Sequence, residues 1–305
     1  MAFQELLPAV VLVSVLFTVA TLLRGCRTKI RLPFPPGPKP KFLLGNLFDI
    51  PTAQPWLTYT KWGKQYGDVV HVQAFGNHIL ILNSVKAATE LLEKRAILYS
   101  DRPTFPMLPI SGGEWMLVFM QHGDRWREHK RMFHQYFRRE AIPAYHPIQL
   151  KKIQDLLRGL LSTPEDFEAH VKTLGAAIIM ATTYGYDIQP THDRRCRDCT
   201  HYIEQSSIFM TGFQQTSVVL ALFIMAMAIN PEVMKKAQNE IDTVVGVGIL
   251  PGFEHRSAMP YCEAVMREVL RWKTIIPLAL PHATSEDDIY EGYFIPKGTT
   301  VLPNV

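Results

Sequence analysis

The feature that most constrains this chain is an uncharged, apolar stretch close to its amino terminus. The stretch covers residues 6–23, and basic residues at 24, 27, 29 and 31 follow it directly. A helix of that length reaches about 27 Å, close to the hydrocarbon thickness of a thin bilayer. The positive charge on its carboxyl-terminal side predicts a single-pass anchor whose following chain faces the cytosol. We therefore expect residues 1–31 to form a membrane anchor with a basic stop.

Two other interpretations compete with the anchor. A cleaved signal peptide would have a basic start, whereas here the basic residues follow the apolar run. A buried core helix is the second alternative, but the position at the start of the chain and the basic flank favour an anchor. Residues 32–48 come next and are predicted to form a stiff hinge, with a plain linker as the alternative. The prolines of this segment include Pro33, Pro35, Pro36, Pro38 and Pro40.

The composition narrows the function classes for the rest of the chain. Apolar residues make up 47% of the sequence, and the formal net charge is +4 without a long basic run. That balance excludes a typical nucleic-acid binder and is compatible with an acidic partner or a membrane surface. The four cysteines are too few for a secreted disulfide framework, so a reducing, cytosol-facing compartment is expected.

The periodicity of the remaining residues predicts a mainly α chain with a small β portion near both ends of the domain. A hairpin is expected around the turn at 75–77, and a strand–turn–strand unit around 296–298. Ser84 is expected to cap a helix. Helices are predicted at 56–66, 84–92, 124–137, 148–161, 165–184, 218–228, 231–244 and 261–272, and strands at 69–72, 78–82, 289–295 and 299–302.

One charged pair gains meaning from its surroundings. Glu268 and Arg271 are three residues apart on a predicted helix, so they share one side of it. Alone this spacing is weak, because surface ion pairs of this kind are common. The pair is followed, in order, by Trp272, Pro277, Pro281-His282 and the segment 293–299. It is preceded by short motifs at 35–38, 45–46, 99–103, 123–127, 230–233 and 241–242.

This ordered series resembles the cytochrome P-450 family, and in particular its basidiomycete microsomal members. The resemblance implies an incomplete cytochrome P-450 fold at residues 49–305, behind an N-terminal transmembrane helix. It also implies a haem cofactor, with Trp126, Lys130 and His282 as partners of the propionates. Trp126 supplies an indole N–H. Lys130 supplies positive charge but lacks the planar guanidinium of an arginine, and the adjacent Arg131 is the expected substitute. Packing in the core is the plain alternative for Trp126.

The resemblance assigns Glu268 and Arg271 a structural role, in a buried network that supports the proximal face of the haem. It further implies an axial thiolate in a Phe- and Gly-rich loop beyond the last predicted strand. None of the chain's cysteines lies in such a loop, so the axial ligand is expected to be absent from a chain that looks truncated. The cysteines are Cys26, Cys196, Cys199 and Cys262.

Two further departures from the family concern the middle of the chain. Gln214 and Gln215 occupy the places of the acid and the Thr that activate oxygen, and Thr216 stands one position late. An amide cannot deliver a proton as a carboxyl can, so no catalytic residue is assigned with confidence at this site. Residues 189–211 form an atypical join that shortens the chain internally, which a mis-joined gene model would also explain. The join contains four possible zinc ligands, His192, Cys196, Cys199 and His201. The alternative is a solvated irregular segment that binds no metal.

The main functional expectation is a monooxygenase that oxidises an apolar small molecule with O2. Electrons would come from NADPH through a membrane-bound reductase, and the process would be secondary metabolism or xenobiotic oxidation. The expected location is the endoplasmic reticulum membrane, with the domain facing the cytosol. A non-catalytic, membrane-tethered remnant that binds no haem is the alternative, and a membrane-anchored metal-binding protein is the third.

Overall fold

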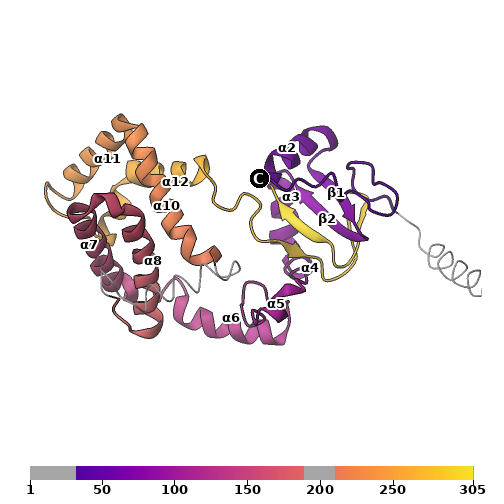
Figure 1. Cartoon of the computed structure of the whole chain (residues 1–305), viewed down its shortest axis with the longest axis horizontal. Helices are drawn as coiled ribbons and strands as arrows, with labels where there is room; N and C mark the ends of the chain where they lie inside the picture. The colour runs from indigo at the N-terminus through magenta and orange to yellow at the C-terminus, as the bar shows by residue number, and fades with distance from the viewer. Residues whose placement is uncertain (1–31, 189–209, 305) are drawn as a thin grey trace, which may run out of the picture. The chain divides into compact units, whose positions relative to one another are not determined.

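A computed structural model describes residues 32–188 and 210–304 of the chain. The predicted anchor and most of the atypical join lie outside these residues. The chain divides into two units, Met1–Pro103 with Leu280–Val305 (unit 1) and Thr104–Ala279 (unit 2), and each is described by itself (Figure 1). Among the described residues, no single helix has the length and apolar character of a membrane span. One pair of helices, Thr216–Ile229 and Pro231–Val244, meets these criteria jointly but is bent by 107°.

Unit 1 is built on a four-stranded sheet in the order β1-β2-β6-β3. The predicted hairpin is confirmed: β1 (Val69–Ala74) pairs antiparallel with β2 (Asn77–Leu82) around the turn at Phe75 and Gly76. β6 (Thr300–Pro303) pairs parallel with β2, and β3 (His282–Ala283) pairs antiparallel with β6. Figure 1 shows this late strand beside the early hairpin. Segments from both ends of the chain therefore form one sheet.

The expected strand–turn–strand unit around residues 296–298 is confirmed, but the predicted bounds of its first strand are wrong. The segment 289–295 is not one strand but a hairpin of β4 (Asp288–Tyr290) and β5 (Tyr293–Ile295), which turns at Glu291 and Gly292. β6 pairs with β2 and β3 instead of β5, because its Val301 is buried beside the fully buried run Leu80–Leu82. The burial offered by a distant strand outweighs the local turn signal.

Short helices cover this sheet. The predicted cap is confirmed, since the Ser84 hydroxyl accepts a hydrogen bond from the Ala87 amide at 3.1 Å. The single helix expected from residue 84 to 92 is instead α3 (Val85–Ala88) followed by a π-helical segment, Thr89–Lys94. The other helices described in this unit are α2 (Pro55–Tyr66) and α4 (Ala96–Tyr99). Their core includes Leu80, Leu82, Leu91, Tyr99, Tyr290, Ile295 and Val301.

The elements described in unit 2 are helical. α8 packs against both α7 and α10, and α10, α11 and α12 pack against one another (Figure 1). The predicted bounds of α6 and α11 agree with the structure. α10 begins eight residues before its predicted start at 218, and the bounds of α7, α8 and α12 differ from the predicted ones by one or two residues. The fold is thus mainly helical with a small sheet portion, as the sequence predicted. The helices are α5 (Met107–Ile110), α6 (Asp124–Phe137), α7 (His146–Ser162), α8 (Phe167–Tyr184), α10 (Met210–Ile229), α11 (Pro231–Val244) and α12 (Pro260–Trp272).

Candidate functional site

Helix α6 carries the first two of the predicted cofactor contacts. Trp126 and Lys130 are four residues apart, so they lie on one side of the helix. The Lys130 ammonium lies 4.4 Å from the centroid of the Trp126 ring, and the His122 ring lies 4.8 Å from it. Trp126 is half-buried, whereas Lys130 and the neighbouring Arg131 are exposed. The helix therefore presents an indole and two cations on an accessible surface, which suits an anionic group.

His282, the third predicted contact, belongs to β3 in unit 1. Its Nδ1 lies 2.9 Å from the backbone oxygen of Tyr99. A carbonyl oxygen only accepts, so Nδ1 donates and the neutral ring has no proton on Nε2. Burial lowers the pKa of His282, and the positive charge of Arg102 lowers this pKa further. His282 must therefore gain a proton before Nε2 donates to a carboxylate, a gain that a bound anion would favour.

Arg102 is a candidate that the sequence analysis missed. Its Nη1 donates to the backbone oxygens of Pro281, at 2.7 Å, and Leu280, at 3.3 Å. These bonds hold a cation next to His282. Burial lowers the pKa of Arg102, yet a guanidinium stays charged in proteins. The signal that could have found Arg102 is the segment 99–103, which contains it. That segment contributed to the family resemblance, but no role was assigned to the Arg102 side chain.

The structure brings the predicted contacts together in two groups. Trp126 and Lys130 contact each other in unit 2, and His282 lies beside Arg102 in unit 1. Each group is defined within its own unit. Their roles toward a cofactor stay predictions.

The Glu268–Arg271 pair forms on α12, but the expected burial is wrong. The two side chains make a bidentate contact at 2.6 and 2.7 Å, and they are 60% and 73% exposed. Hydrogen bonding from Arg271 lowers the pKa of Glu268. The buried residues of α12, Val265 and Val269, pack against α10, so the charged pair lies outside that contact. Support of a haem face by this pair stays a prediction.

The oxygen-activating positions lie in α10. Gln214 and Gln215 are within the bounds of this helix, but their side chains lie outside what the structure describes. Thr216 is exposed on the same helix. Their proposed effect on proton delivery is therefore not tested by the geometry.

Cys262 is the cysteine that the described residues contain. Its thiol donates to the backbone oxygen of Ala237 at 3.6 Å. Burial, together with the carboxylate of Glu240, raises the pKa of Cys262 to about 11. The thiol stays protonated at neutral pH and does not fit a thiolate ligand. The described residues hold no cluster of three or more metal-ligating side chains. The other cysteines, and the proposed zinc ligands His192 and His201, lie outside them.

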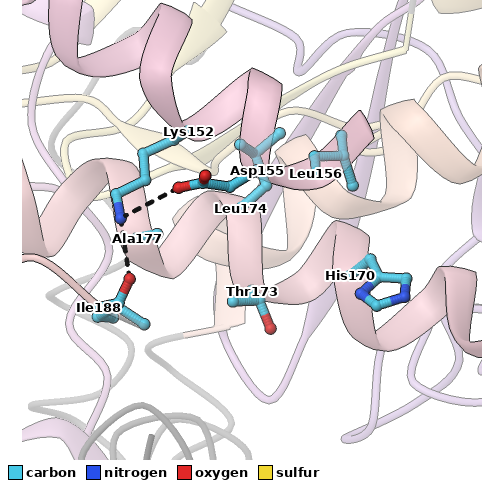
Figure 2. A pocket seen from close by; sticks show the side chains of 8 residues that line it. All are labelled: Lys152, Asp155, Leu156, His170, Thr173, Leu174, Ala177 and Ile188. Carbon is cyan, nitrogen blue, oxygen red and sulfur yellow. Dashed lines mark hydrogen bonds and ion pairs between the residues drawn. The ribbon is translucent and has the colours of Figure 1, made fainter. Parts of the chain in front are cut away.

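A buried lysine stands out in unit 2, and its surroundings give it a structural role. Lys152 of α7 is 4% exposed, and its ammonium donates to the Asp187 carboxylate. It also donates to the Ile188 backbone oxygen, and Figure 2 shows this bond together with the contact to Asp155. Asp155 lies 3.7 Å away. A buried cation of this kind needs such partners, and here they tie α7 to the chain that leaves α8. The adjoining cavity of about 20 Å³ has room for a water molecule.

The helical chain with its small sheet, and the indole and cations on α6, fit the haem-dependent class that the sequence indicated. A family model described as cytochrome P450 matches residues 35–185 and 192–305. The chain therefore belongs to the cytochrome P-450 family, whose monooxygenases are oxidoreductases. The gap between the two matched stretches falls at the start of the predicted join, and residues 192–211 lie inside the second stretch.

Curated fungal proteins are similar to the chain over most of its length. Cytochrome P-450 monooxygenase COX1 of Coprinopsis cinerea is 31% identical over 90% of this chain and 71% of its own length. Cytochrome P-450 monooxygenase 105 of Postia placenta is 31% identical over 90% of this chain and 70% of its own. Cytochrome P-450 monooxygenase 208 of the same fungus is 31% identical over 97% and 74%.

Proposed function

We propose that this chain functions as a haem-dependent monooxygenase that oxidises an apolar small molecule with O2. NADPH-derived electrons would reach it from a membrane-bound reductase, in secondary metabolism or xenobiotic oxidation. The observation that carries the proposal is the Trp126–Lys130 contact on α6, in a chain of the cytochrome P-450 family. The relatives named above, all monooxygenases, support it. The proposed location is the endoplasmic reticulum membrane, with one span and the domain in the cytosol.

The described residues fit the edge of a haem. Propionates need donors and positive charge, which Trp126 and Lys130 offer from α6 within unit 2. Within unit 1, Arg102 and protonated His282 would offer such groups separately. When bound, haem supplies the chemistry that activates O2. The described residues do not supply the axial thiolate, because the Cys262 thiol is directed at the Ala237 backbone oxygen of α11. The role proposed for these residues is to hold and orient the anionic edge of the group, which they would do when it is bound.

The first experiment isolates the charge of Lys130. Hemin is titrated into the purified chain, and binding is followed by the change in the Soret band. We expect Lys130→Glu to weaken binding roughly 10–100-fold, since a charge-assisted hydrogen bond is worth about 1.5–3 kcal/mol. Lys236→Glu is the matched control, because the Lys236 ammonium also lies over an aromatic ring, that of Tyr261, at 4.5 Å. Equal losses of hemin affinity in both variants would contradict a role for Lys130 in binding haem.

The second experiment tests the axial ligand and the activity. A reduced carbon monoxide spectrum of the thiolate type, with substrate oxidation that depends on NADPH and reductase, would support the monooxygenase. Cys262→Ser should leave that spectrum unchanged, since this thiol donates to the Ala237 backbone oxygen. A chain that never changes the Soret band of hemin would instead support a membrane-tethered protein without haem. Gln214→Asp with Gln215→Thr should raise the coupling of NADPH use to product.

The third experiment tests the membrane location. Removal of residues 1–31 should release the chain from membranes or leave only peripheral binding, because the uncharged run 6–23 is lost with its basic flank. The measurement is extraction of the membrane fraction with alkaline carbonate. A truncated chain that still resists extraction would contradict the anchor.

A further inference from the structure

Two serines of this chain, Ser162 and Ser285, are each followed by a run of acidic residues. The acidic residues are Glu165, Asp166 and Glu168 in the first case and Glu286, Asp287 and Asp288 in the second. A serine with carboxylates on its carboxyl-terminal side presents the charge pattern that a protein kinase with a basic substrate groove selects. The pattern alone does not choose between the two serines, whereas their surroundings do.

Ser285 lies in a firmly paired part of unit 1. Its amide donates to the Leu98 backbone oxygen at 2.8 Å, and its hydroxyl lies 3.3 Å from the same oxygen. The Asp288 carboxylate accepts hydrogen bonds from Arg95 and Tyr99. Both the hydroxyl and a carboxylate that would recruit a kinase are therefore already engaged within the unit.

Ser162 has the opposite surroundings. It is the last residue of α7 and is exposed, and its hydroxyl donates to the Gly159 backbone oxygen of the same helix at 3.1 Å. Thr163 then leaves the helical conformation, with φ −141° and ψ 70°. Because helix ends fray, a partner can extend this segment without opening the core of unit 2.

The acidic side chains after Ser162 are available to a partner. They lie in the short 3-10 segment Pro164–Asp166 and in the first turn of α8, and all three are exposed. Among residues 32–188 and 210–304, none of the three side chains takes part in an ion pair. Their charge is therefore open to attract a basic groove to this turn.

Thr163, the adjacent hydroxyl, is the poorer acceptor of a phosphate. Its Oγ1 lies 2.8 Å from Nε2 of His170, so it is engaged with α8. Pro164 follows it directly, and a proline fixes the backbone there and removes an amide donor. Ser162 is therefore the accessible hydroxyl of this turn.

Arg158 gives a modified Ser162 a cation to pair with. It precedes Ser162 by four residues, so the two share one side of α7. Its guanidinium is 73% exposed and pairs with Asp155 at 3.2 Å. A phosphate at 162 carries about two negative charges and would compete for this guanidinium. That attraction offsets the unfavourable position of an anion at the carboxyl terminus of a helix.

We propose that Ser162 is phosphorylated by a protein kinase that recognises acidic residues on the carboxyl-terminal side of its substrate serine. The γ-phosphoryl group of ATP moves to the Ser162 oxygen: that O–P bond forms, the bond to the ADP oxygen breaks, and the hydroxyl proton passes to the base of the kinase. In the cell, access to ATP rests on the proposed location, with the domain in the cytosol. The modification places new negative charge between α7 and α8.

The test treats the folded full chain with casein kinase II, a kinase of this acidic specificity, and radiolabelled ATP. Mass spectrometry maps the labelled positions, and circular dichroism confirms that the parent chain and each variant are folded. We expect Ser162→Ala to lower phosphate incorporation roughly tenfold, and Glu165→Gln with Asp166→Asn to lower it several-fold, because the charges that recruit the kinase are lost. Ser285→Ala is the matched control and should leave incorporation unchanged.

Synthetic peptides of residues 157–168 and 280–291 separate the charge pattern from the fold. Both peptides should be labelled, since each carries its acidic run without the structure around it. A folded chain that stays unlabelled while the 157–168 peptide is labelled would overturn the proposal, as would labelling of the folded chain at Ser285 or at Thr163 in place of Ser162. These measurements need no membrane and no haem, so a failure of the proposed function would not affect them.

Discussion

Two ion pairs, one in each unit, show how differently this chain uses charge. In unit 1, Arg95 pairs with Asp288 across 193 residues of sequence at 2.8 Å, with side chains 33% and 13% exposed. In unit 2, Glu268 and Arg271 pair within one helical turn and are mostly exposed. The distant pair needs the sheet and helices of unit 1 to be folded first. The local pair needs only its own helix.

The surroundings of the two pairs differ in the same way. The hydroxyl of Tyr99 also donates to Asp288 at 2.9 Å, and the Arg95 guanidinium lies 5.5 Å from the Tyr290 ring centroid. Tyr99 is fully buried, and its burial, with the Asp288 carboxylate, raises its pKa. Breaking this network leaves the hydroxyl of buried Tyr99 without its acceptor, whereas breaking the local pair leaves both groups in water.

The largest effect is expected from Asp288→Ala, which removes the acceptor shared by Arg95 and Tyr99. Loss of one partner in a buried pair costs about 3–5 kcal/mol, and the partial exposure of Arg95 places this case near 3 kcal/mol. The measurement is the urea unfolding midpoint by circular dichroism. Lys86→Ala is the control, because Lys86 is 81% exposed and lies 3.8 Å from Glu291. Equal midpoints for the two variants would erase the contrast between the two kinds of ion pair.

A histidine pair sharpens the comparison through pH. His71 Nε2 lies 2.9 Å from His78 Nδ1 across the hairpin, and burial, followed by the charge of His78, lowers the pKa of His71 to about 4. The unfolded state then binds the proton more readily. Stability should therefore be constant above about pH 6.5 and fall as pH decreases toward 4, by on the order of 3 kcal/mol. His71→Gln should flatten urea midpoints measured across this range, and parallel curves for variant and parent would show that His71 does not titrate there.

The smallest effect is expected from Arg271→Ala. An exposed pair contributes about 0–1 kcal/mol, so its urea midpoint should stay close to that of the parent chain. Lys235→Ala is the matched control, because Lys235 pairs with Glu232 at the same three-residue spacing, 3.5 Å apart. A loss as large as that of Asp288→Ala would show that the Glu268–Arg271 pair is buried in the working protein, as the family resemblance implies.

Most helices were predictable because their signals are local. The bounds of α6 and α11 follow from periodicity and from Pro231, and the Ser84 cap follows from one hydroxyl near one amide. The pairing of β6 was not predictable, because a turn at 296–298 fits two different partners. The same limit applied to the site: Trp126 and Lys130 share a helix, whereas the proton on His282 depends on Tyr99, which is 183 residues away.

The sequence by itself determined the family, the helix-rich character of the chain and the candidates Trp126, Lys130 and His282, since these rest on ordered motifs and short-range spacing. The tertiary structure decided which strand β6 joins, which ion pair is partly buried, and that Arg102 lies beside His282. It also decided that the Cys262 thiol is held protonated against Ala237. The physical reason is that burial and charge at a residue depend on neighbours from distant parts of the chain, which no local pattern specifies.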